Sequence, residues 1–427
     1  MIMDILPNHF EYENGILHAE RVSALRIAED IGTPAYVYSS AAIAERFAAL
    51  QSGLSGIDHL ICYAMKANSN QAILKLLKGL GAGFDAVSGG EYSRAIAAGV
   101  PGEKIVFSGV GKSASEMKTA LECGIRQFNV ESEPEISLLN EVAVSLGAKA
   151  PVAIRVNPNV DAETHEKIST GKSENKFGVP IARARSIYSE AAKLPGIEIT
   201  GIDIHIGSQV RSIAPFRKAF SMVADLTAVL RADGHAISRL DLGGGLGIAY
   251  NRRGETSISP EDYCRTILES VGHLDCEIEI EPGRFIVGDA GILLSTVLYV
   301  KDGSDRRFLV VDAAMNDLMR PAIYDAYHEI VPVFEPGSRR DWERVDVVGP
   351  VCETSDTFAR HRLLPKFSEG DAVAFLSAGA YGSSMASEYN TRALVPEVLV
   401  KGGTHAVIRK RPSIQEIIER DIVPAWL

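Results

Sequence analysis

The stretch His59-Leu60-Ile61-Cys62-Tyr63-Ala64-Met65-Lys66-Ala67-Asn68 runs from apolar residues into a polar turn and contains a single lysine. Residues 60–65 are apolar, which is typical of a strand buried on both faces. Apolar residues then recur at helical spacing over residues 71–80, so Lys66 is expected at a strand-to-helix turn. A lysine that loses part of its hydration there becomes an amine nucleophile more readily. A solvated loop lysine is the alternative interpretation, because most lysines lie at the surface.

Composition narrows the classes of protein and partner. At 427 residues the chain is long enough for two domains, or for one barrel with an addition. Lys and Arg number 44 against 55 for Asp and Glu, which gives a formal net charge of −11. A polyanion partner requires a concentrated basic surface, so we expect no nucleic-acid binding. No apolar run reaches about 18 residues, the length that would indicate a membrane span, so we expect no membrane partner.

The N-terminus and the cysteines indicate the compartment. Residues 1–15 contain no basic segment followed by an apolar one, so we expect no signal peptide. The five cysteines are scattered and form no C-x-x-C pair, which favours a reducing cytoplasm without a disulfide framework or a bound metal ion. They are Cys62, Cys123, Cys264, Cys276 and Cys352.

Strand-like and helical segments alternate regularly through most of the chain. The strand-like runs cover residues 59–66, 83–88, 104–109, 127–131, 152–157, 199–206, 239–243 and 277–282. Eight βα units in series predict an α/β fold with a parallel (β/α)₈ barrel of TIM type rather than an open doubly wound sheet. Capping signals support the intervening helices. The predicted starts are Ser113-x-x-Glu116, Ser132-x-x-Glu135 and Ser259-Pro260, and the predicted ends are Gly124 and Gly147.

After Arg284 the pattern changes to strands without long helices, separated by Gly, Pro and Asp turns. We predict a barrel over residues 34–285 and a mainly antiparallel β domain over residues 286–427, which residues 1–33 are expected to join. Strands of this second domain are predicted at residues 291–301, 308–312, 345–351 and 372–377.

Polar residues gather at the carboxyl ends of the predicted barrel strands, where such barrels build their active sites. Along the chain they are Lys66, Asp85, Ser88, Ser108, Glu131, Asn157, His205, Gly207, Ser208, Gly243, Gly244, Gly245, Glu281, Gly283 and Arg284. Because all eight ends meet at one mouth, a reactive Lys66 becomes as good an interpretation as a solvated one.

Three of these groups have both a functional and a structural interpretation. The glycines within residues 241–247 offer backbone amides that can cradle a phosphate, or form a tight turn, and their spacing is not a dinucleotide-binding fingerprint. His205 lies at the end of an apolar strand. It is either a residue of the active site or a histidine that is packed and hydrogen-bonded in the core. Glu281 and Arg284 lie on either side of a turn. They are either functional groups of the site or a structural ion pair.

A lysine, a glycine loop, a histidine and a carboxylate at one barrel mouth suit pyridoxal 5'-phosphate. The lysine would form a Schiff base, and the glycine amides would hold the phosphate. The carboxylate would keep the ring nitrogen protonated, so that the ring withdraws electrons.

Longer motifs extend this pattern over nearly the whole chain. They are Tyr63–Asn68, Phe84–Glu91, Arg155–Asp161 with Thr164-His165, Lys167-Ile168, Thr170-Gly171 and Asn175–Gly178, then His205–Gln209, Glu281–Arg284, Met315–Pro321 with Tyr324, Cys352-Glu353 and Tyr381. In these motifs the chain closely resembles the diaminopimelate decarboxylase family, pyridoxal-phosphate enzymes on an alanine-racemase-like barrel. The resemblance implies decarboxylation of meso-2,6-diaminopimelate at its D centre to L-lysine, the last step of lysine biosynthesis.

The resemblance also implies roles at the cofactor. Lys66 would form the Schiff base, His205 would stack on the ring, and Glu281 would pair with the pyridine nitrogen. The other cofactor contacts would come from Asp85, Ser208, Gly243, Gly244, Gly245, Gly283, Arg284 and Tyr381.

Further roles concern the substrate and the partner subunit. Arginine would bind the distal carboxylate and glutamate the distal ammonium, within the set Arg284, Arg320, Tyr324, Glu353 and Tyr381. In the family the Cys-Glu pair reaches the site from the second subunit, which implies a homodimer with shared active sites. The β domain would then contribute to both the substrate site and the dimer interface. Cys352 would protonate the substrate carbon after carbon dioxide leaves.

One motif departs from the family, which usually has Cys-Glu-Ser-Gly-Asp. This chain has Cys352-Glu353-Thr354-Ser355-Asp356. A serine in place of glycine would reshape the loop if the backbone there requires positive φ.

Three alternative functions are a racemase, a decarboxylase for another amino acid, and a pyridoxal-phosphate protein without catalytic activity. Racemases resembling this fold place an arginine at the ring nitrogen, whereas Glu281 preserves the strong electron sink that decarboxylation needs. Ornithine, lysine and arginine decarboxylases act on precursors without the distal amino-acid end that Arg320 and Glu353 suit. A catalytically silent pyridoxal-phosphate protein would be expected to lack Lys66 or Cys352, and both are present.

Overall fold

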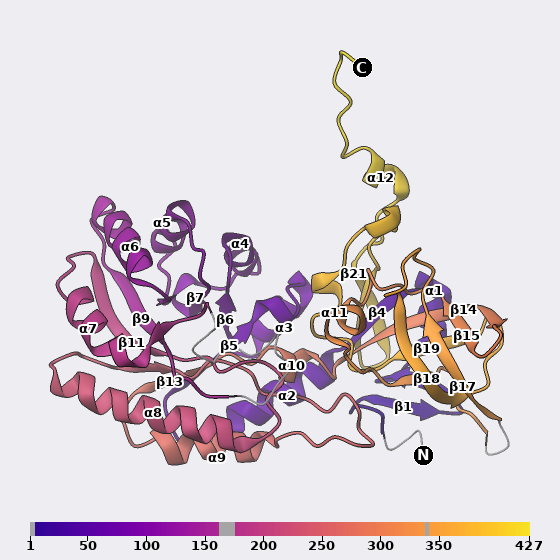
Figure 1. Ribbon diagram of the computed structural model, residues 1–427, viewed down its shortest axis with the longest axis horizontal. Coiled ribbons are helices and arrows are strands. Elements are labelled where there is room, and N and C mark those ends of the chain that lie inside the picture. The colour runs from indigo at the N-terminus through magenta and orange to yellow at the C-terminus, as the bar shows by residue number, and fades with distance from the viewer. Residues whose placement is uncertain (1–4, 162–175, 338–340) are drawn as a thin grey trace. The chain divides into compact units, whose positions relative to one another are not determined.

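The computed structural model describes residues 5–161, 176–337 and 341–427 (Figure 1). By its contacts the chain divides into a barrel unit, residues 44–248 and 256–286, and a β unit, residues 1–43, 249–255 and 287–427. The motif residues from Thr164 to Asn175 lie outside the described residues.

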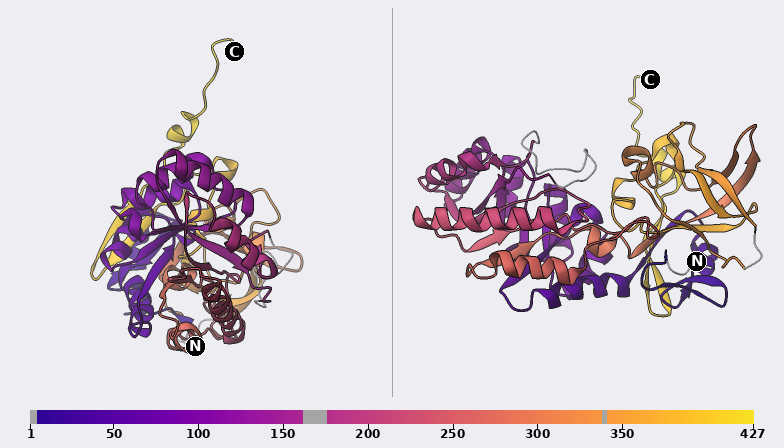
Figure 2. Two further views of the ribbon diagram at one scale, coloured as in Figure 1. Left: turned by 90° about the vertical axis from the view of Figure 1, so that its left-hand side faces the viewer. Right: turned by 60° about the horizontal axis from the view of Figure 1, so that its bottom comes forward.

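Eight parallel strands close into a ring in the barrel unit (Figure 2, left). In order around the ring they are β5 (His59–Ala64), β6 (Gly83–Ala86), β7 (Ile105–Phe107), β8 (Gln127–Val130), β9 (Ala150–Asn157), β11 (Ile197–Asp203), β12 (Arg239–Asp241) and β13 (Glu277–Ile280). β13 pairs with β5 and completes the closure. Each strand overlaps its predicted run, so the (β/α)₈ barrel is confirmed.

Helices surround these strands, as Figure 2 shows in its left view. They are α3 (Gln71–Gly79), α4 (Gly89–Ala97), α5 (Ala114–Glu122), α6 (Glu133–Ser145), α7 (Ile181–Ala191), α8 (Ile213–Ala232) and α9 (Pro260–Val271). The turns η2 (Met65–Ala67) and η3 (Gly102–Lys104), the short strand β10 (Val179–Pro180) and the short helix α10 (Arg284–Val287) complete the connections. The periodicity predicts a buried face made of Ile73, Leu76, Leu77 and Leu80. Ile73 and Leu77 are buried, as predicted, but Leu76 is half-buried and Leu80, just beyond the end of α3, is exposed; Leu74 is buried instead.

Helix caps follow the sequence in all but one detail. The capping box of Ser113 and Glu116 is complete. Ser132 accepts the N–H of Glu135, but the Glu135 carboxylate binds the buried ammonium of Lys112 at 2.6 Å. That half of the predicted box is wrong, because one Glu135 oxygen binds the Lys112 ammonium and the other accepts the N–H of Glu131 at 2.9 Å, so neither binds the N–H of Ser132. The remaining signals are confirmed: φ is +69° at Gly124 and +63° at Gly147, and Ser259 caps α9 with Pro260 in its first turn.

A mixed, mainly antiparallel sheet forms the centre of the β unit. Its strands run in the order β18 (Thr357–Pro365), β17 (Trp342–Val348), β15 (Arg307–Val311), β14 (Gly291–Asp302), β4 (Ala35–Ser39), β20 (Glu397–Lys401) and β21 (Thr404–Arg409). β19 (Ala372–Phe375) pairs with β14 and with β16 (Ile330–Pro332). Among the described pairs of this sheet, β15–β17 and β4–β20 are parallel and the others antiparallel. The predicted mainly antiparallel β domain is therefore confirmed as a fold.

The N-terminal segment contributes both to this sheet and to a small sheet of its own. β1 (Phe10–Glu13), β2 (Ile16–Ala19) and β3 (Val22–Ser23) pair antiparallel, and α1 (Ala24–Ile31) follows them. β4 then pairs with β14 and β20 before α2 (Ser40–Gly53) begins. Residues 34–43 therefore lie with the β unit by contacts, although the sequence analysis assigns them to the barrel range.

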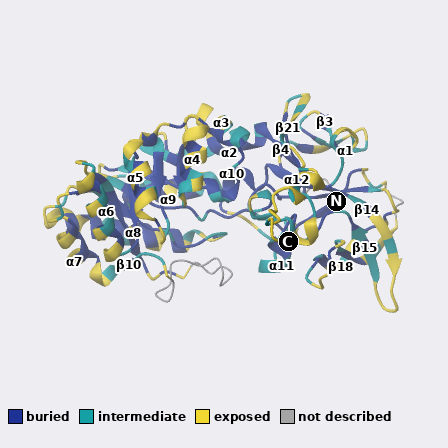
Figure 3. Cartoon of the chain, turned by 90° about the horizontal axis from the view of Figure 1, so that it is seen from above, coloured by how far each residue is buried: buried dark blue, intermediate teal, exposed yellow. Residues whose placement is uncertain are grey.

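Buried apolar residues from both ends of the β unit's sequence form one core. Leu17, Ile27, Val37, Leu294 and Val398 are examples of its fully covered members. Figure 3 shows the buried residues in dark blue and the exposed outer turns of helices in yellow. Across the described ranges, none of the helices combines the length and the hydropathy that crossing a bilayer demands.

Candidate active site

Lys66 lies in η2, directly beyond the end of β5, as the sequence predicts. Its Nζ is 3.2 Å from Oδ2 of Asp85. Asp85 lies on β6, directly opposite Ala64 of the neighbouring strand β5. The Lys66 side chain is 35% exposed, whereas that of Asp85 is completely buried. The other carboxylate oxygen of Asp85, Oδ1, is buried and has no hydrogen-bond partner among the described residues. A second donor therefore has a place to bind beside the lysine.

Glu281 follows β13 and is buried at the same end of the barrel. Its Oε1 accepts hydrogen bonds from Ser108 Oγ at 3.2 Å and from Asn129 Nδ2 at 3.4 Å. Burial, followed by the nearby carboxylates of Asp241 and Asp85, raises the pKa of Glu281 well above its usual range. A cation placed beside this carboxylate would keep it ionised.

His205 stands next to Glu281, with Nδ1 3.8 Å from Glu281 Oε2. Burial, with smaller contributions from Arg155 and Lys66, lowers the pKa of His205 well below its usual range. The ring is therefore neutral and forms no ion pair with Glu281. Its Nδ1 accepts the N–H of Gly244 at 3.1 Å, which places the ring proton on Nε2.

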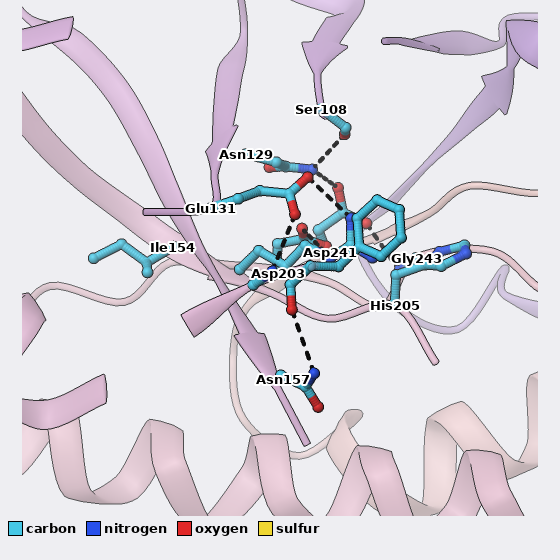
Figure 4. Close-up of polar contacts among 12 residues, drawn as sticks. Ser108, Asn129, Glu131, Ile154, Asn157, Asp203, His205, Asp241 and Gly243 are labelled. Atoms are coloured by element: carbon cyan, nitrogen blue, oxygen red, sulfur yellow. Dashed lines mark hydrogen bonds and ion pairs between the residues drawn. The ribbon is translucent and has the colours of Figure 1, made fainter. Parts of the chain in front are cut away.

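Two buried residues that the sequence analysis left without a role complete this polar cluster (Figure 4). Asn129 Nδ2 donates to Asp241 Oδ2 at 2.8 Å as well as to Ser108 Oγ at 3.1 Å. Asp203 is 4.0 Å from Arg155, and burial raises its pKa. Both residues could have been found from the sequence, because polar residues occupy every second position of their otherwise apolar strands, a spacing that places them on one face.

Arg155 connects this cluster to the end of β8. Its Nη1 donates to Glu131 Oε1 at 3.1 Å, and its guanidinium lies 4.9 Å from the centre of the Phe177 ring. Glu131 also accepts the N–H groups of Gly109 and Gly178, each at 3.1 Å. The strand ends of β7, β8 and β9 are therefore joined by charge-assisted hydrogen bonds.

The glycine loop after β12 packs more tightly than any side chain would permit. A Cβ atom on Gly243 would lie 2.3 Å from the Ile204 carbonyl oxygen, and one on Gly244 would lie 2.2 Å from that of Glu281. Gly243 and Gly245 also have positive φ, +65° and +104°.

The amides of this loop are partly used within the protein. The N–H of Gly243 donates to Asp241 at 3.0 Å and that of Gly244 to His205. Each of these two amides thus has an acceptor within the protein, and the contact of the glycine loop with a phosphate stays a prediction. The loop also orients His205 and brings the end of β12 close to the Glu281 backbone.

The turn from Glu281 to Arg284 lies against the segment that carries Lys66. The Ala64 N–H donates to the Pro282 carbonyl, and a Cβ on Gly283 would lie 3.0 Å from that of Ala67. Arg284 Nη2 donates to Ser208 Oγ at 2.9 Å. Ser208, beyond the end of β11, and the 281–284 turn, beyond the end of β13, therefore lie together although β12 separates the two strands.

The remaining predicted site residues belong to the β unit. Arg320 begins α11 (Arg320–Tyr324), is buried, and stacks 4.1 Å from the Tyr250 ring centre. Its Nη1 donates to His328 Nε2 at 2.8 Å. Tyr324 lies four residues on, on the same face of this helix.

Cys352 and Glu353 are exposed on the loop between β17 and β18. The Ser355 hydroxyl donates to the Glu353 carboxylate. Ser355 is not among the described residues with positive φ, so the serine fits this backbone without strain. Tyr381 does have positive φ, +54°, in the turn before η5 (Ser383–Met385).

The barrel unit's residues fit pyridoxal phosphate. Lys66 presents a primary amine, Asp85 retains an unsatisfied carboxylate oxygen, and Glu281 is a buried carboxylate that a protonated ring nitrogen would neutralise. The neutral ring of His205 supplies a flat surface beside them. No group of three or more His, Cys, Asp or Glu side chains in the described ranges is arranged to hold a metal ion.

Comparison with known families agrees with this fit. A family model described as the pyridoxal-binding domain of pyridoxal-dependent decarboxylases matches residues 40–288. The fold and the site thus define a pyridoxal-dependent decarboxylase, and the chain belongs to that class.

Individual relatives identify the family within the class. The chain is 47% identical to diaminopimelate decarboxylase of Zymomonas mobilis over 421 residues, which cover 98% of this chain and 99% of the relative. It is 48% identical to that of Pseudomonas aeruginosa over 408 residues, 96% of this chain and 97% of the relative. The solved diaminopimelate decarboxylase of M. jannaschii, in co-complex with L-lysine, superposes with a TM-score of 0.94 at 37% identity, covering 99% of this chain and 100% of that one. The chain belongs to the diaminopimelate decarboxylase family.

Proposed function

We propose that this protein decarboxylates meso-2,6-diaminopimelate to L-lysine with bound pyridoxal 5'-phosphate. The observation that carries the proposal is the buried Glu281 carboxylate, 3.8 Å from a neutral His205 and surrounded by further acids. An arginine at this position would suit racemisation instead, because it would weaken the electron sink. Names and complexes of relatives support the same substrate.

The cofactor's chemistry is simple to state: when bound, it withdraws the electron pair of the bond to the departing carboxylate. Lys66 would hold it covalently, and Asp85 would keep the lysine oriented. Glu281 would keep the ring nitrogen protonated, and His205 would pack on the ring face. The phosphate and ring contacts would come from Ser208, Gly243, Gly244, Gly245, Gly283, Arg284 and Tyr381.

Residues of the β unit would select the substrate. Arg320, held by His328 and Tyr250, would bind the distal carboxylate, because a guanidinium forms a two-pronged pair with a carboxylate. Glu353 would bind the distal ammonium, while Arg284, Tyr324 and Tyr381 would complete the pocket.

Cys352 would deliver a proton to the substrate carbon that loses its carboxylate. Its exposure on a loop is compatible with a role in a second subunit's site. We therefore propose a homodimer with shared active sites. The free state of all five cysteines supports the cytoplasm as the compartment.

The decisive experiment measures carbon dioxide release from meso-diaminopimelate, L-lysine, L-ornithine and L-arginine side by side. We expect release from diaminopimelate and L-lysine as the product. In Arg320→Ala the KM for diaminopimelate should rise by roughly tenfold or more, because a charged hydrogen bond is lost. Faster release from ornithine or arginine, or racemisation without release, would overturn the proposal.

A further inference from the structure

The loop between β17 and β18 carries Cys352 and Glu353 and ends at a buried aspartate, Asp356. Asp356 is only 3% exposed. Its Oδ2 accepts the backbone N–H of Val351 at 2.7 Å, immediately before Cys352. The Asp356 N–H in turn donates to the Glu353 carbonyl at 3.0 Å. The carboxylate therefore closes the loop around the two exposed residues.

The same carboxylate reaches a second segment of the β unit. Its other oxygen, Oδ1, accepts the backbone N–H of Met315 at 2.7 Å. Ser355 Oγ also lies 3.4 Å from the Met315 sulfur. Two neighbouring residues of the loop thus contact Met315.

Met315 begins the turn that leads into Arg320. The Leu318 N–H donates to the Ala314 carbonyl at 3.1 Å, and the Ala314 N–H donates to Asp317 Oδ2 at 2.8 Å. These bonds tie the residues on either side of Met315 into one tight turn, and α11 starts directly after it. A displacement of the Met315 amide would therefore be transmitted to Arg320.

Gly349 shows how closely this arrangement is packed. A Cβ atom there would lie 2.4 Å from both Asp356 carboxylate oxygens and 2.7 Å from the Ala313 carbonyl oxygen. Only glycine lets the β17 end approach both the carboxylate and the 313–315 segment.

We infer that Asp356 is a positioning residue that fixes the Cys352–Glu353 loop and the Arg320 segment in one arrangement, so that proton delivery and distal-carboxylate binding depend on the same carboxylate. This inference rests on the proposed roles of Cys352 and Arg320. An amide cannot replace the carboxylate, because its NH₂ group would face a backbone N–H where an acceptor is required.

Double-mutant cycles separate positioning from general destabilisation. In the otherwise native holoenzyme, Asp356→Asn should lower kcat and raise KM for diaminopimelate, each by about tenfold, the effect of one lost hydrogen bond to a charged group. With Cys352→Ala already present, it should change kcat less than about twofold. With Arg320→Ala present, it should change KM less than about twofold. If the loss in kcat or KM of either double variant equals the product of the losses of its two single variants, the shared role is overturned.

Asp346 provides a matched control. Asp346 is also 3% exposed and lies on β17, where its carboxylate accepts hydrogen bonds from the His361 N–H at 2.7 Å and from Arg306 Nη1 at 3.1 Å. Among the described residues, its side chain forms no hydrogen bond with the 313–317 or 349–353 segment. Asp346→Asn should alter thermal stability while leaving kcat and KM within about twofold, as expected for a site without shared partners. A profile like that of Asp356→Asn would mean that any buried acid of this sheet has the same effect.

Hydrogen exchange tests the contacts without using activity. In the wild-type holoenzyme, the amides of Met315 and Val351 should be protected to a similar degree. In Asp356→Asn, peptides covering residues 313–317 and 349–353 should both exchange faster, while residues 397–401 are unchanged. Gly349→Ala is a second variant, which keeps the carboxylate but places a Cβ atom where the carboxylate lies, so it should produce the same pattern.

The outcomes distinguish the two proposals. Full activity of Cys352→Ala and Arg320→Ala would refute their proposed roles, whatever the exchange result. If those variants are impaired, but either wild-type amide exchanges as fast as an exposed loop, the inference about Asp356 fails alone. The wild-type measurement decides this point even if neither variant folds.

Discussion

Lys66 and Asp85 form an ion pair whose members differ sharply in exposure. The lysine side chain is 35% exposed and the aspartate 0%. A buried carboxylate is costly without a cation beside it. Lys66 is therefore both the proposed attachment point of the cofactor and the charge partner that lets Asp85 remain buried.

Two substitutions separate these two tasks. Lys66→Ala should abolish the visible absorbance of the bound cofactor and also destabilise the barrel unit, because Asp85 loses its cation. Lys66→Arg should abolish the same absorbance yet keep most of the stability, since a guanidinium retains the charge but cannot act as the amine. Absorbance spectra and thermal unfolding provide the two measurements. Retained visible absorbance in either variant would show that another residue holds the cofactor.

Asp317 shows how burial changes a charge in the β unit. Burial raises the pKa of Asp317 to about 6, although the Ala314 N–H and Arg392 act in the opposite direction. In the unfolded chain the pKa of an aspartate is about 3.9. The folded protein thus holds a proton at intermediate pH that the unfolded chain has lost. The stabilisation is complete below about pH 4 and is lost as the pH rises through about 6.

Asp317→Asn should remove this pH dependence, because asparagine does not titrate. The free energy of unfolding of the wild type relative to the variant should fall by roughly 2 kcal/mol between about pH 4 and pH 7. Denaturant unfolding of both proteins at several pH values measures the difference. A difference that is constant with pH would mean that Asp317 is ionised throughout.

The loop between β12 and α9 illustrates the scale of elements. Its glycines are predictable as a turn, but their close approach to other strand ends depends on the closed barrel. The Gly244 position, where a Cβ would lie 2.2 Å from the Glu281 carbonyl oxygen, joins β12 to the end of β13. A side chain there would move the two strand ends apart.

Gly244→Ala should therefore weaken cofactor binding by about tenfold and lower stability by about 1–3 kcal/mol, as overpacking does. Gly79→Ala is the matched control, because Gly79 ends α3 and a Cβ atom added there would have no neighbour within 4 Å among the described residues. It should leave cofactor affinity unchanged and alter stability by no more than about 1 kcal/mol. Titration with pyridoxal phosphate and thermal unfolding measure both effects. Equal cofactor affinity in the two variants would show that the strand ends tolerate the displacement.

At the scale of the whole molecule, the proposed homodimer predicts complementation between two inactive variants. Lys66→Ala and Cys352→Ala damage different parts of the site. If the cysteine acts in the partner's site, each mixed dimer has one intact site, so the purified mixed dimer should have about half of native activity and the unfractionated random mixture about a quarter. Co-expression with two affinity tags isolates the mixed dimer, and each variant alone is the control. Mixed dimers with no more activity than either parent would mean that each site is built from one chain.

The sequence by itself determined the eight βα units, the β domain after them and the residue types at the strand ends. These depend on periodicity, caps and composition, which act over a few neighbouring residues. The tertiary structure decided the partners of those residues: the diversion of Glu135 to Lys112, the neutral state of His205, and the contact of Asp356 with both Val351 and Met315. Desolvation and long-range hydrogen bonds depend on groups from distant segments, and these come together only when the chain has folded.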